Sequence, residues 1–386
     1  MQVILPPPDN HPQELAGALA EATDALKQGK LVAFPTETVY GVGAVATNDQ
    51  GYDKLVALKS RPGSVPFAIH MGSPDEAGRY VDLSSPMLKR LIRRVFPGPV
   101  TLVLAVSDET IKAKCEQMGL PIEQADRIYH NNTVGLRCPD HPAANILLHH
   151  ANAGGPVLAS SANLRGQEPS KNADDVLASL GDTPEVEILI DGGQSTFSRP
   201  STVVRVTENP NGSADFQVER EGVFDEPTIR RMLQWTLLLV CSGNTCRSPM
   251  AEVLARKELA VARDIPMDKL ADAGIRVLSA GTSAMSGMPA TEQAQQVMAN
   301  MGLDLSTHRS RSLSAEMIRD ADVVYCMTES HRQGVLSLAP DAGYKVELLD
   351  SAGDISDPFG SDVTNYARCA EVIRRRLAQR LKEQQV

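Results

Sequence analysis

Aromatic residues make up only 4% of this 386-residue chain, with a single tryptophan, and long apolar runs are missing. No stretch approaches the roughly 18 apolar residues that a membrane-spanning helix needs. The first residues also lack the basic start and apolar centre of a secretory signal. We therefore expect a cytoplasmic protein with no membrane partner.

Cysteine is scarce and scattered, with six residues in the whole chain. Proteins that depend on disulfides carry cysteine at much higher density, so these six are interpreted as reduced thiols. Cys241 and Cys246 lie five residues apart, and no second Cys/His pair has the spacing of metal ligands. This pattern disfavours a zinc site, and we nominate no metal ligands.

An excess of positive charge is missing too, since the formal net charge is −10 and acidic residues outnumber basic ones in both halves. Strong nonspecific RNA binding depends on neutralising phosphates, so RNA is not expected as a tight ligand. A local run of Lys89, Arg90, Arg93 and Arg94 is typical of a solvated helix face. The remaining composition, with 42% hydrophobic residues, is that of a globular protein of two or three domains.

The most informative segment is the run Cys241-Ser-Gly-Asn-Thr-Cys-Arg-Ser248, which follows an apolar stretch at residues 237–240. Ser248 and Pro249 suit the start of a helix. The backbone N–H groups of such a loop and the positive end of the helix converge on one point, where a phosphoryl group fits. Arg247 can hold two of its oxygens, and the same field favours the thiolate form of Cys241 beneath the phosphorus.

Two other interpretations of this run are weaker. A buried core residue is the commonest fate of a free cysteine, but it does not account for the whole pattern. A nucleotide-binding loop of the Walker type ends in Gly-Lys-Ser/Thr, which is missing here. Attack by the cysteine on a phosphoryl group would also need a proton donor for the leaving group, and Asp357 is the candidate. Pro358 restricts Asp357 to extended geometry, which suits a carboxylate held over a pocket. Taken alone, the Asp-Pro pair is more often part of an ordinary turn.

Residues 236–386 resemble the low-molecular-weight protein tyrosine phosphatases over their whole length. Besides the run above, the matching motifs are Ser279-Ala-Gly-Thr282, His308-Arg-Ser-Arg311 and Asp357-Pro-Phe, in that order. The resemblance implies an α/β fold with a Rossmann-like, doubly wound parallel sheet and no cofactor. It implies a phosphocysteine at Cys241 formed from a phosphoprotein substrate.

The same resemblance implies the roles of the other residues. Arg247 would bind phosphate, and Asp357 would act as general acid and then as general base. The Asn244 side chain would be tied to His308, and the Ser248 hydroxyl would donate to the thiolate. The residues implied to support the phosphate loop are Ser242, Gly243, Asn244, Thr245, Cys246, Ser248 and His308.

Two positions are similar to the bacterial protein-arginine phosphatase branch of that family, namely Thr245 and Phe359. A small hydroxyl in the pocket leaves room and a polar partner for a guanidinium or a hydrolytic water, so we favour phosphoarginine over phosphotyrosine as substrate. An arsenate reductase can share this loop and fold. That chemistry needs extra resolving cysteines, and Cys326 and Cys369 are isolated.

The first half of the chain predicts a separate α/β domain. Leu15, Leu19, Ala22 and Leu26 recur at helical spacing after Pro12. Short apolar runs predict more strands than helices, which favours a twisted mixed sheet. The strands are expected at residues 31–34, 101–105, 133–136, 157–159, 186–190 and 202–206. We expect domains at residues 10–222 and 236–386, joined by a linker at 223–235.

Three polar clusters stand out in this first half: Pro35-Thr-Glu-Thr-Val-Tyr-Gly41, Lys59-Ser-Arg61 with His70, and Ser160-Ser-Ala-Asn163. The first follows a strand, where α/β proteins place ligands. Two cations with hydroxyl and amide groups suit a triphosphate or carboxylate ligand. Each cluster is also compatible with an ordinary helix end or turn.

Together with Arg137-Cys-Pro-Asp140-His-Pro142, Ser201-Thr-Val-Val-Arg205 and Arg220-Glu-Gly222, these clusters resemble the YrdC-like threonylcarbamoyl-AMP synthases over roughly residues 10–222. The resemblance implies that ATP, with Mg²⁺, reacts with L-threonine and bicarbonate to give threonylcarbamoyl-AMP and pyrophosphate. The product would serve tRNA modification, so tRNA is an indirect partner. The chain departs from the family at Val65-Pro66, where Asn-Pro is usual.

The resemblance also implies a set of binding residues. Threonine and the carbonyl chemistry would be surrounded by Thr36, Lys59, Arg61 and His70, with Arg137 also in the site. The nucleotide would be held by Ser161, Asn163, Ser201 and Arg205. The alternative is a catalytically silent nucleotide- or RNA-binding module that regulates an active phosphatase.

Overall fold

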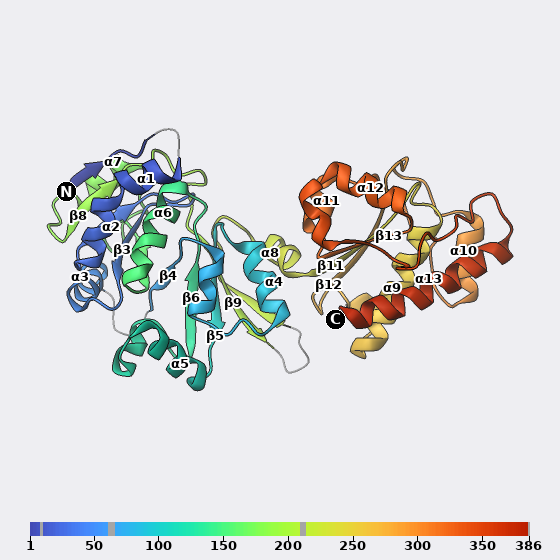
Figure 1. Cartoon of the computed structure of the whole chain (residues 1–386), viewed down its shortest axis with the longest axis horizontal. Helices are drawn as coiled ribbons and strands as arrows, with labels where there is room; N and C mark the ends of the chain where they lie inside the picture. The colour runs from blue at the N-terminus through green and yellow to red at the C-terminus, as the bar shows by residue number, and fades with distance from the viewer. Residues whose placement is uncertain (8–10, 61–65, 209–213, 385–386) are drawn as a thin grey trace. The chain divides into compact units, whose positions relative to one another are not determined.

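The computed structural model describes residues 1–7, 11–60, 66–208 and 214–384. The chain divides into two compact units, Met1–Met232 and Leu233–Val386 (Figure 1). None of the helices in these described ranges is long and apolar enough to cross a membrane. The same ranges contain no group of three or more His, Cys, Asp or Glu side chains placed to hold a metal ion.

The described part of the first unit contains one ten-stranded sheet in which parallel and antiparallel pairs are mixed. The strands predicted from apolar runs are all present, so the expected mixed sheet is confirmed. In spatial order the strands are β1 (Gln2–Ile4), β8 (Val186–Ile190), β2 (Leu31–Phe34), β3 (Gly41–Val45), β7 (Val157–Ser161), β4 (Ala68–His70), β6 (Thr133–Arg137), β5 (Val100–Ala105), β9 (Thr202–Glu208) and β10 (Ala214–Arg220).

Sequence periodicity missed β1, β3, β4 and β10. β3 is rich in glycine, β1 and β4 have three residues each, and β10 alternates half-exposed and exposed side chains. None of them presents a long apolar run. These segments are strands because they pair with adjacent strands of the sheet, and their own side chains do not signal it.

One layer of helices covers part of this sheet and shares a core with it. The helices of the unit are α1 (Pro12–Ala18), α2 (Ala20–Lys27), α3 (Asp49–Lys59), α4 (Pro86–Val95), α5 (Asp108–Met118), α6 (Pro142–Ala151), α7 (Ala173–Leu180) and α8 (Glu226–Leu233), with 3₁₀ turns η1 (Pro74–Arg79), η2 (Ile122–Arg127) and η3 (Asn152–Gly154). Side chains of α1, α2 and α6 pack on β2, β7 and β8.

The single helix predicted from Leu15 to Leu26 is instead two helices. Leu19 lies between them with ψ of 2°, well away from the helical value near −42°. Gly17 in the preceding turn weakens the helix there. All the apolar residues of the pattern remain buried, so the periodicity correctly marked the buried face but not the break.

Residues 233–384, the described part of the second unit, contain one four-stranded sheet in which all strand pairs are parallel. Its strands, in spatial order, are β12 (Ile275–Gly281), β11 (Trp235–Cys241), β13 (Val323–Cys326) and β14 (Val346–Leu348). Its helices are α9 (Arg247–Arg263), α10 (Glu292–Asn300), α11 (Ala315–Asp320), α12 (Glu329–Leu338) and α13 (Val363–Glu383), with η4 (Met267–Lys269) and η5 (Pro340–Lys345).

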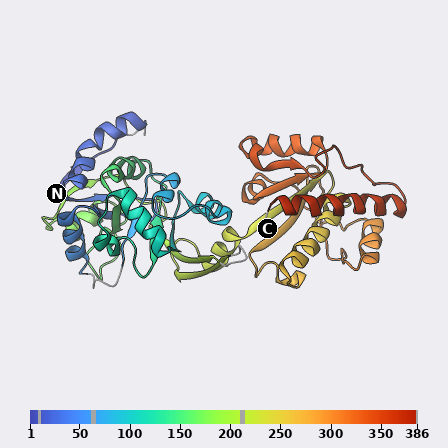
Figure 2. The same cartoon turned by 60° about the horizontal axis from the view of Figure 1, so that its bottom comes forward.

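Central strand β11 shows why this sheet is covered on both faces. Leu237 and Leu239 belong to the core formed with α9, α10 and α13. Leu238 and Val240 point the other way, into the core formed with α11 and α12. Figures 1 and 2 show α11 and α12 on the opposite side of the sheet from α9 and α13. The predicted doubly wound parallel sheet is confirmed, and such sheets bind ligands at the carboxyl ends of their strands.

Candidate active sites

The phosphate loop of the second unit joins the carboxyl end of β11 to the start of α9. Cys241 is the last residue of the strand, and α9 begins at Arg247 with Cys246 at the N-cap position. Asn244 has φ of 53°, in the left-handed region, and its N–H donates to the Cys241 sulfur over 3.3 Å. Our expectation that Ser248 begins the helix was wrong by two residues, because its hydroxyl is used inside the loop instead.

A hydrogen-bond network surrounds the Cys241 sulfur. The backbone N–H of Arg311 donates to Asn244 Oδ1 over 2.9 Å, so Asn244 Nδ2 must face the other way as a donor. Nδ2 donates to Ser248 Oγ at 2.9 Å and to Ser279 Oγ at 2.8 Å. Ser248 Oγ accepts the first of these hydrogen bonds, and its own hydrogen can be donated to Cys241 Sγ, 3.0 Å away, or to the Ala280 carbonyl oxygen, 3.5 Å away. Two donors, this hydroxyl and the Asn244 N–H, can therefore point at the nucleophilic sulfur.

His308 supports the loop in a different way from the one expected. Its Nε2 lies 2.8 Å from the backbone carbonyl oxygen of Asn244, not from the side chain. The expected side-chain contact is therefore wrong, because the Asn244 amide is already committed to the serines and to a backbone N–H. His308 still holds the residue whose left-handed backbone shapes the loop, and it is 9% exposed.

Several residues of the network were not nominated from the sequence. Ser279 Oγ donates to Glu252 Oε2 over 2.5 Å, so a carboxylate on α9 ends the chain of hydrogen bonds. Arg311 contributes only its backbone. Ser279 and Arg311 belong to the short motifs quoted above, and membership of those motifs could have identified them as site residues. Glu252 lies in no such motif, and only the fold brings it to Ser279.

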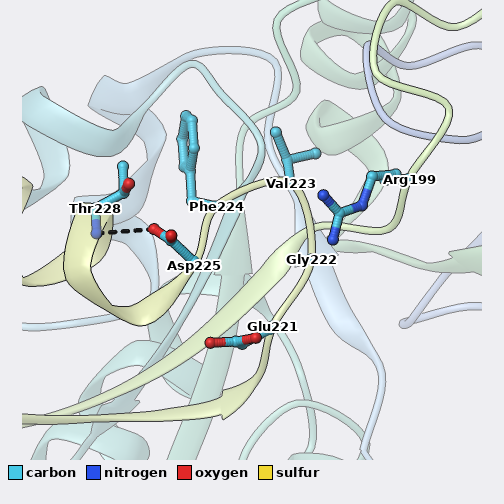
Figure 3. Close-up of a pocket in the computed structure, with 7 residues that line it drawn as sticks. All are labelled: Arg199, Glu221, Gly222, Val223, Phe224, Asp225 and Thr228. Atoms are coloured by element: carbon cyan, nitrogen blue, oxygen red, sulfur yellow. Dashed lines mark hydrogen bonds between the residues drawn. The ribbon is translucent and has the colours of Figure 1, made fainter.

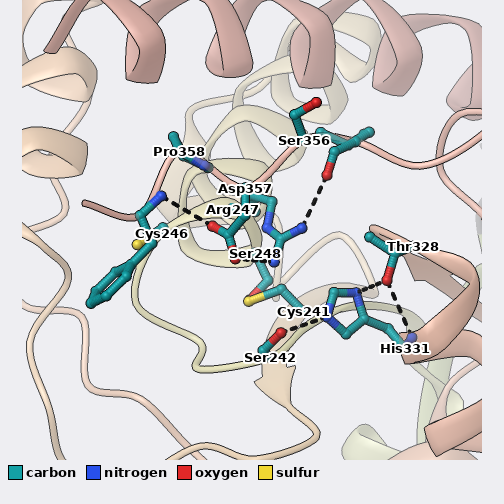
Figure 4. Close-up of polar contacts among 12 residues, drawn as sticks. Cys241, Ser242, Cys246, Arg247, Ser248, Thr328, His331, Ser356, Asp357 and Pro358 are labelled. Atoms are coloured by element: carbon teal, nitrogen blue, oxygen red, sulfur yellow. Dashed lines mark hydrogen bonds and ion pairs between the residues drawn. The ribbon is translucent and has the colours of Figure 1, made fainter. Parts of the chain in front are cut away.

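Arg247 and Asp357 form an ion pair at the mouth of the loop. Arg247 Nη2 donates to Asp357 Oδ2 over 2.5 Å, and Nη1 donates to the Ile355 carbonyl oxygen over 3.0 Å (Figure 4). The Arg247 side chain is 5% exposed and the Asp357 side chain is 45% exposed. Arg247 Nε is buried with no hydrogen-bond partner in the described part of the chain. The guanidinium is therefore fixed in place while the carboxylate stays within reach of solvent.

The far side of the loop rests on α13 and on the start of α10. Cys246 Sγ lies 3.2 Å from the hydroxyl of Tyr366 and 3.7 Å from Thr291 Oγ1. The Thr291 N–H also donates to the Thr245 carbonyl oxygen over 2.9 Å. The Thr245 side chain is half-buried, and its Oγ1 lies 3.7 Å from Cys246 Sγ. Phe359, next to the ion pair in sequence, is 72% exposed.

His331, which was not nominated from the sequence, also contacts the loop. It lies in the first turn of α12, is 4% exposed, and places Nε2 2.7 Å from Ser242 Oγ. No motif pointed to it. The remaining loop residue nominated, Gly243, is half-buried, and a Cβ there would meet only Thr245 Oγ1 at 3.4 Å.

The two isolated cysteines are poorly placed to act as resolving thiols. Cys326 and Cys369 are both buried, and burial raises the pKa of each thiol to about 12. A protonated, buried thiol is a poor nucleophile in disulfide exchange. This disfavours the arsenate reductase interpretation.

In the first unit, Arg137 at the end of β6 gathers the residues of the turn after β2. Its Nη2 donates to Thr38 Oγ1 over 2.5 Å, to Glu37 Oε1 over 3.0 Å and to Thr36 Oγ1 over 3.4 Å. Glu37 Oε2 accepts the N–H of Asp140 at 3.0 Å. The nominated Thr36 and Arg137 thus lie together, along with Glu37 and Thr38, which were not nominated. Arg137 Nε has no hydrogen-bond partner within the described ranges.

Lys59 at the end of α3 is buried against the segment that follows β7. Its Nζ donates to the carbonyl oxygens of Ser161 at 2.9 Å and Asn163 at 2.6 Å, and lies 3.4 Å from Asn163 Oδ1. Asn163 Nδ2 in turn donates to the Gln167 carbonyl oxygen over 2.6 Å. The three nominated residues therefore form one cluster. The Lys59 cluster adjoins the cluster around Arg137. The segment that begins with Thr36 leads to Gly41 at the start of β3, and Gly41 pairs with Ser161 of β7.

His70, at the end of β4, is buried near the same arginine. Burial, followed by the positive charge of Arg137, lowers the pKa of His70 to about 3. The imidazole is therefore neutral at pH 7, with Nδ1 3.2 Å from the Ala68 carbonyl oxygen. A neutral ring can donate or accept a hydrogen bond but adds no charge to the site.

The residues expected to hold the nucleotide do not all gather. Ser201 Oγ lies 3.0 Å from Thr101 Oγ1 and 3.2 Å from Nη2 of Arg220. Arg205 instead pairs with Glu219 on the neighbouring strand, Nε to Oε1 at 2.6 Å, and both side chains are exposed to solvent. Arg220 therefore contacts Ser201 while the nominated Arg205 lies in a surface ion pair. Arg61 and Val65 lie outside the described residues.

A pocket near the C-terminal end of the first unit adjoins the nominated Ser201, since a Cβ on its lining residue Gly222 would lie 2.4 Å from the Ser201 carbonyl carbon. It is lined by Arg199, Glu221, Gly222, Val223, Phe224, Asp225 and Thr228 (Figure 3). Asp225 Oδ1 accepts the N–H of Thr228 over 3.0 Å and so caps α8. The carboxylate is thus already used structurally.

Both halves of the chain match families of known proteins. Residues 24–222 match the Sua5/YciO/YrdC family model, described as telomere recombination. Residues 236–386 match the model of the low molecular weight phosphotyrosine protein phosphatases.

Individual relatives are similar to one half or the other. Threonylcarbamoyl-AMP synthase from Bacillus subtilis is 32% identical over 210 residues, 52% of this chain and 55% of that protein. The chain thus spans about half the length of that relative. The probable low molecular weight protein-tyrosine-phosphatase EpsP of Ralstonia nicotianae is 36% identical over 36% of this chain and 89% of its own length. A YwlE mutant structure from Bacillus subtilis has 30% identity and a TM-score of 0.36, covering 40% of this chain and all of that one.

Proposed function

Because this chain belongs to the Sua5/YciO/YrdC family and to the low molecular weight phosphotyrosine protein phosphatase family, we propose that it is a bifunctional enzyme. The second unit hydrolyses phosphoproteins through a cysteine nucleophile. The first unit makes threonylcarbamoyl-AMP, the activated donor for tRNA modification. The observation that carries the phosphatase proposal is the Cys241 sulfur at a strand end, within 3.3 Å of both the Asn244 N–H and the Ser248 hydroxyl.

The proposed phosphatase reaction follows from the residues around that sulfur. The substrate phosphoryl group lies in the loop, where its oxygens take the place of Asp357 on the Arg247 guanidinium. Cys241 attacks phosphorus, an S–P bond forms, and the bond to the leaving group breaks as Asp357 gives it a proton. Water then attacks the phosphocysteine, Asp357 takes the water proton, and inorganic phosphate leaves with Cys241 restored.

We favour phosphoarginine as the substrate class over phosphotyrosine. The support is the Thr245 hydroxyl, which lies in the loop between Asn244 and Cys246 on a half-buried side chain. A hydroxyl there offers a polar partner to a guanidinium N–H or to the hydrolytic water, and a branched aliphatic side chain would exclude both. Phe359 is exposed and can pack on either substrate, so it discriminates little.

Thr245→Ile tests this preference. The variant replaces the hydroxyl with an apolar branch, so we expect kcat/KM on phosphoarginine peptides to fall about tenfold to a hundredfold, the scale of one hydrogen bond in a specificity pocket. Hydrolysis of aryl phosphates should hold or rise. Side-by-side kinetics on phosphoarginine and phosphotyrosine peptides provide the measurement. Efficient hydrolysis of phosphotyrosine alone by the parent enzyme would assign the chain to tyrosine instead.

The proposed synthase reaction joins L-threonine, bicarbonate and ATP. The threonine amine and bicarbonate combine with loss of water, and the resulting carboxylate attacks the α-phosphorus of ATP and displaces pyrophosphate. Arg137 and Lys59 lie among hydroxyl and amide groups where the phosphate and carboxylate charges would be held, and Mg²⁺ accompanies ATP as part of the substrate. No general base is nominated, so positioning and charge stabilisation supply the catalysis.

Pyrophosphate release by the full-length chain tests the synthase proposal. Release that requires threonine and bicarbonate together identifies the synthase. ATP binding without such release identifies the catalytically silent regulatory module instead.

A further inference from the structure

A second series of hydrogen bonds connects α12 to the phosphate loop. Ser242, the residue directly after Cys241, has its Oγ 2.7 Å from His331 Nε2. On the other side of the ring, Nδ1 lies 2.9 Å from Oγ1 of Thr328, the N-cap residue of α12. Figure 4 shows the imidazole between the two hydroxyls, on the side of the loop where Cys241 lies. Both ring nitrogens are therefore used, one of them on the loop.

The hydrogen bonds around His331 allow the ring to act as the donor to Ser242. Thr328 Oγ1 accepts the backbone N–H of His331 over 3.3 Å, so its own hydrogen is available for Nδ1. In that tautomer Nε2 is protonated and donates to Ser242 Oγ. Burial, followed by the charge of Arg247, lowers the pKa of His331 to about 4, while Asp357 and Asp354 act in the opposite direction. The ring is therefore neutral at pH 7.

Ser242 is held from its other side as well. Its carbonyl oxygen accepts the N–H of Ser283 over 3.0 Å. Gly281 at the end of β12 passes so close that a Cβ there would lie 2.3 Å from that same oxygen. The main chain of Ser242 is thus fixed by the end of β12 and its side chain by α12. Because Ser242 begins the loop, its orientation sets where the following N–H groups point.

We propose that His331 is a positioning residue of the phosphatase site, which acts through Ser242 to hold the start of the phosphate loop in the geometry that binds a phosphoryl group. The inference rests on the proposed phosphatase function and deepens it. His331 does not touch the substrate. It joins the first turn of α12 to the residue beside the nucleophile, and it does so through a neutral ring.

Two amide variants separate the two ends of the imidazole. In His331→Gln the amide reaches the place of Nε2 and can still donate to Ser242, whereas in His331→Asn it reaches only the place of Nδ1. We expect His331→Asn to bind inorganic phosphate about tenfold more weakly, and His331→Gln to lose less than about threefold. Ser242→Ala should lose as much as His331→Asn, and the double variant should lose no more than either.

Phosphate binding is measured on the full-length chain as protection of Cys241 from iodoacetamide, with the Cys241 peptide quantified by mass spectrometry. This measurement does not depend on turnover. Ser337→Ala, which removes an exposed hydroxyl of α12 that donates to the Gln333 carbonyl oxygen over 2.8 Å, is the control and should leave protection unchanged. Thermal unfolding of each variant separates weakened binding from lost stability.

The outcomes distinguish the two proposals. Equal protection in the Gln and Asn variants, or additive losses in the double variant, would overturn positioning through Ser242. A parent chain that phosphate does not protect would overturn the phosphatase proposal itself. If His331→Asn unfolds, Ser242→Ala alone decides, because that side chain is only half-buried.

Discussion

Cys241→Ser is expected to lower phosphatase turnover by about ten thousandfold or more, the scale of losing a covalent nucleophile. The loop places this sulfur opposite the Ser248 hydroxyl and the Asn244 N–H, both of which favour an anion. A serine hydroxyl has no comparable anionic fraction at pH 7, so the phosphoenzyme cannot form at a useful rate. Release of inorganic phosphate from an aryl phosphate is the measurement.

Two controls accompany this variant. Cys115→Ser makes the same chemical change at a buried thiol of the first unit and should leave phosphatase turnover unaltered. Threonine-dependent pyrophosphate release by Cys241→Ser should equal that of the parent, since the two reactions share no intermediate. Residual phosphatase activity within tenfold of the parent would remove Cys241 from its proposed role.

Lys59→Met is expected to lower threonine-dependent pyrophosphate release by about a hundredfold to a thousandfold, as loss of one preorganised charge does in other active sites. Methionine keeps the length of the side chain but cannot donate. The carbonyl oxygens of Ser161 and Asn163, which the ammonium now binds at 2.9 and 2.6 Å, would lose a charged donor inside the protein. The segment that contains them should therefore shift, and nucleotide binding should weaken with it.

Lys54→Met in the same helix is the matched control. Its Nζ donates to the Gly29 carbonyl oxygen over 3.0 Å, away from the nominated residues, so its effect should stay within about twofold, as expected for one partly exposed hydrogen bond. Phosphatase turnover should be unchanged in both lysine variants. Full synthase activity in Lys59→Met would show that the proposed site is misplaced.

Local sequence was informative where one short segment carries the chemistry. Between Cys241 and Ser248, the nucleophile, the loop and the guanidinium are contiguous, and the apolar strand before them and helix after them follow from simple patterns. Short apolar runs likewise predicted the mixed sheet, because burial of a strand leaves a trace in its sequence, whereas the parallel sheet was implied by the family resemblance. These features are determined by residues close together in the sequence, so a single sequence is enough to predict them.

The sequence alone did not indicate which residues far apart in the chain come into contact. Ser242 and His331 are 89 positions apart, and Ser279 and Glu252 are 27 apart. Arg220 contacts Ser201 through the antiparallel pairing of β9 and β10, while Arg205, nominated from a motif, turns to Glu219. A motif ranks residues by type and spacing, and strand register then decides which of them share a partner.

The sequence by itself therefore determined the two families, the two α/β classes and the nucleophilic loop, because each is encoded in contiguous residues or in periodic burial. Only the tertiary structure decided that Arg247 holds Asp357, that Lys59 is enclosed by the carbonyl oxygens after β7, and that His331 supports Ser242. In the first unit, Lys59 meets residues at the end of β7, a strand that pairs antiparallel with β3 and β4. In the second unit, such contacts arise where parallel strands bring their carboxyl ends, and the helices that follow them, to one edge of the sheet. Residues far apart in the chain become neighbours at that edge.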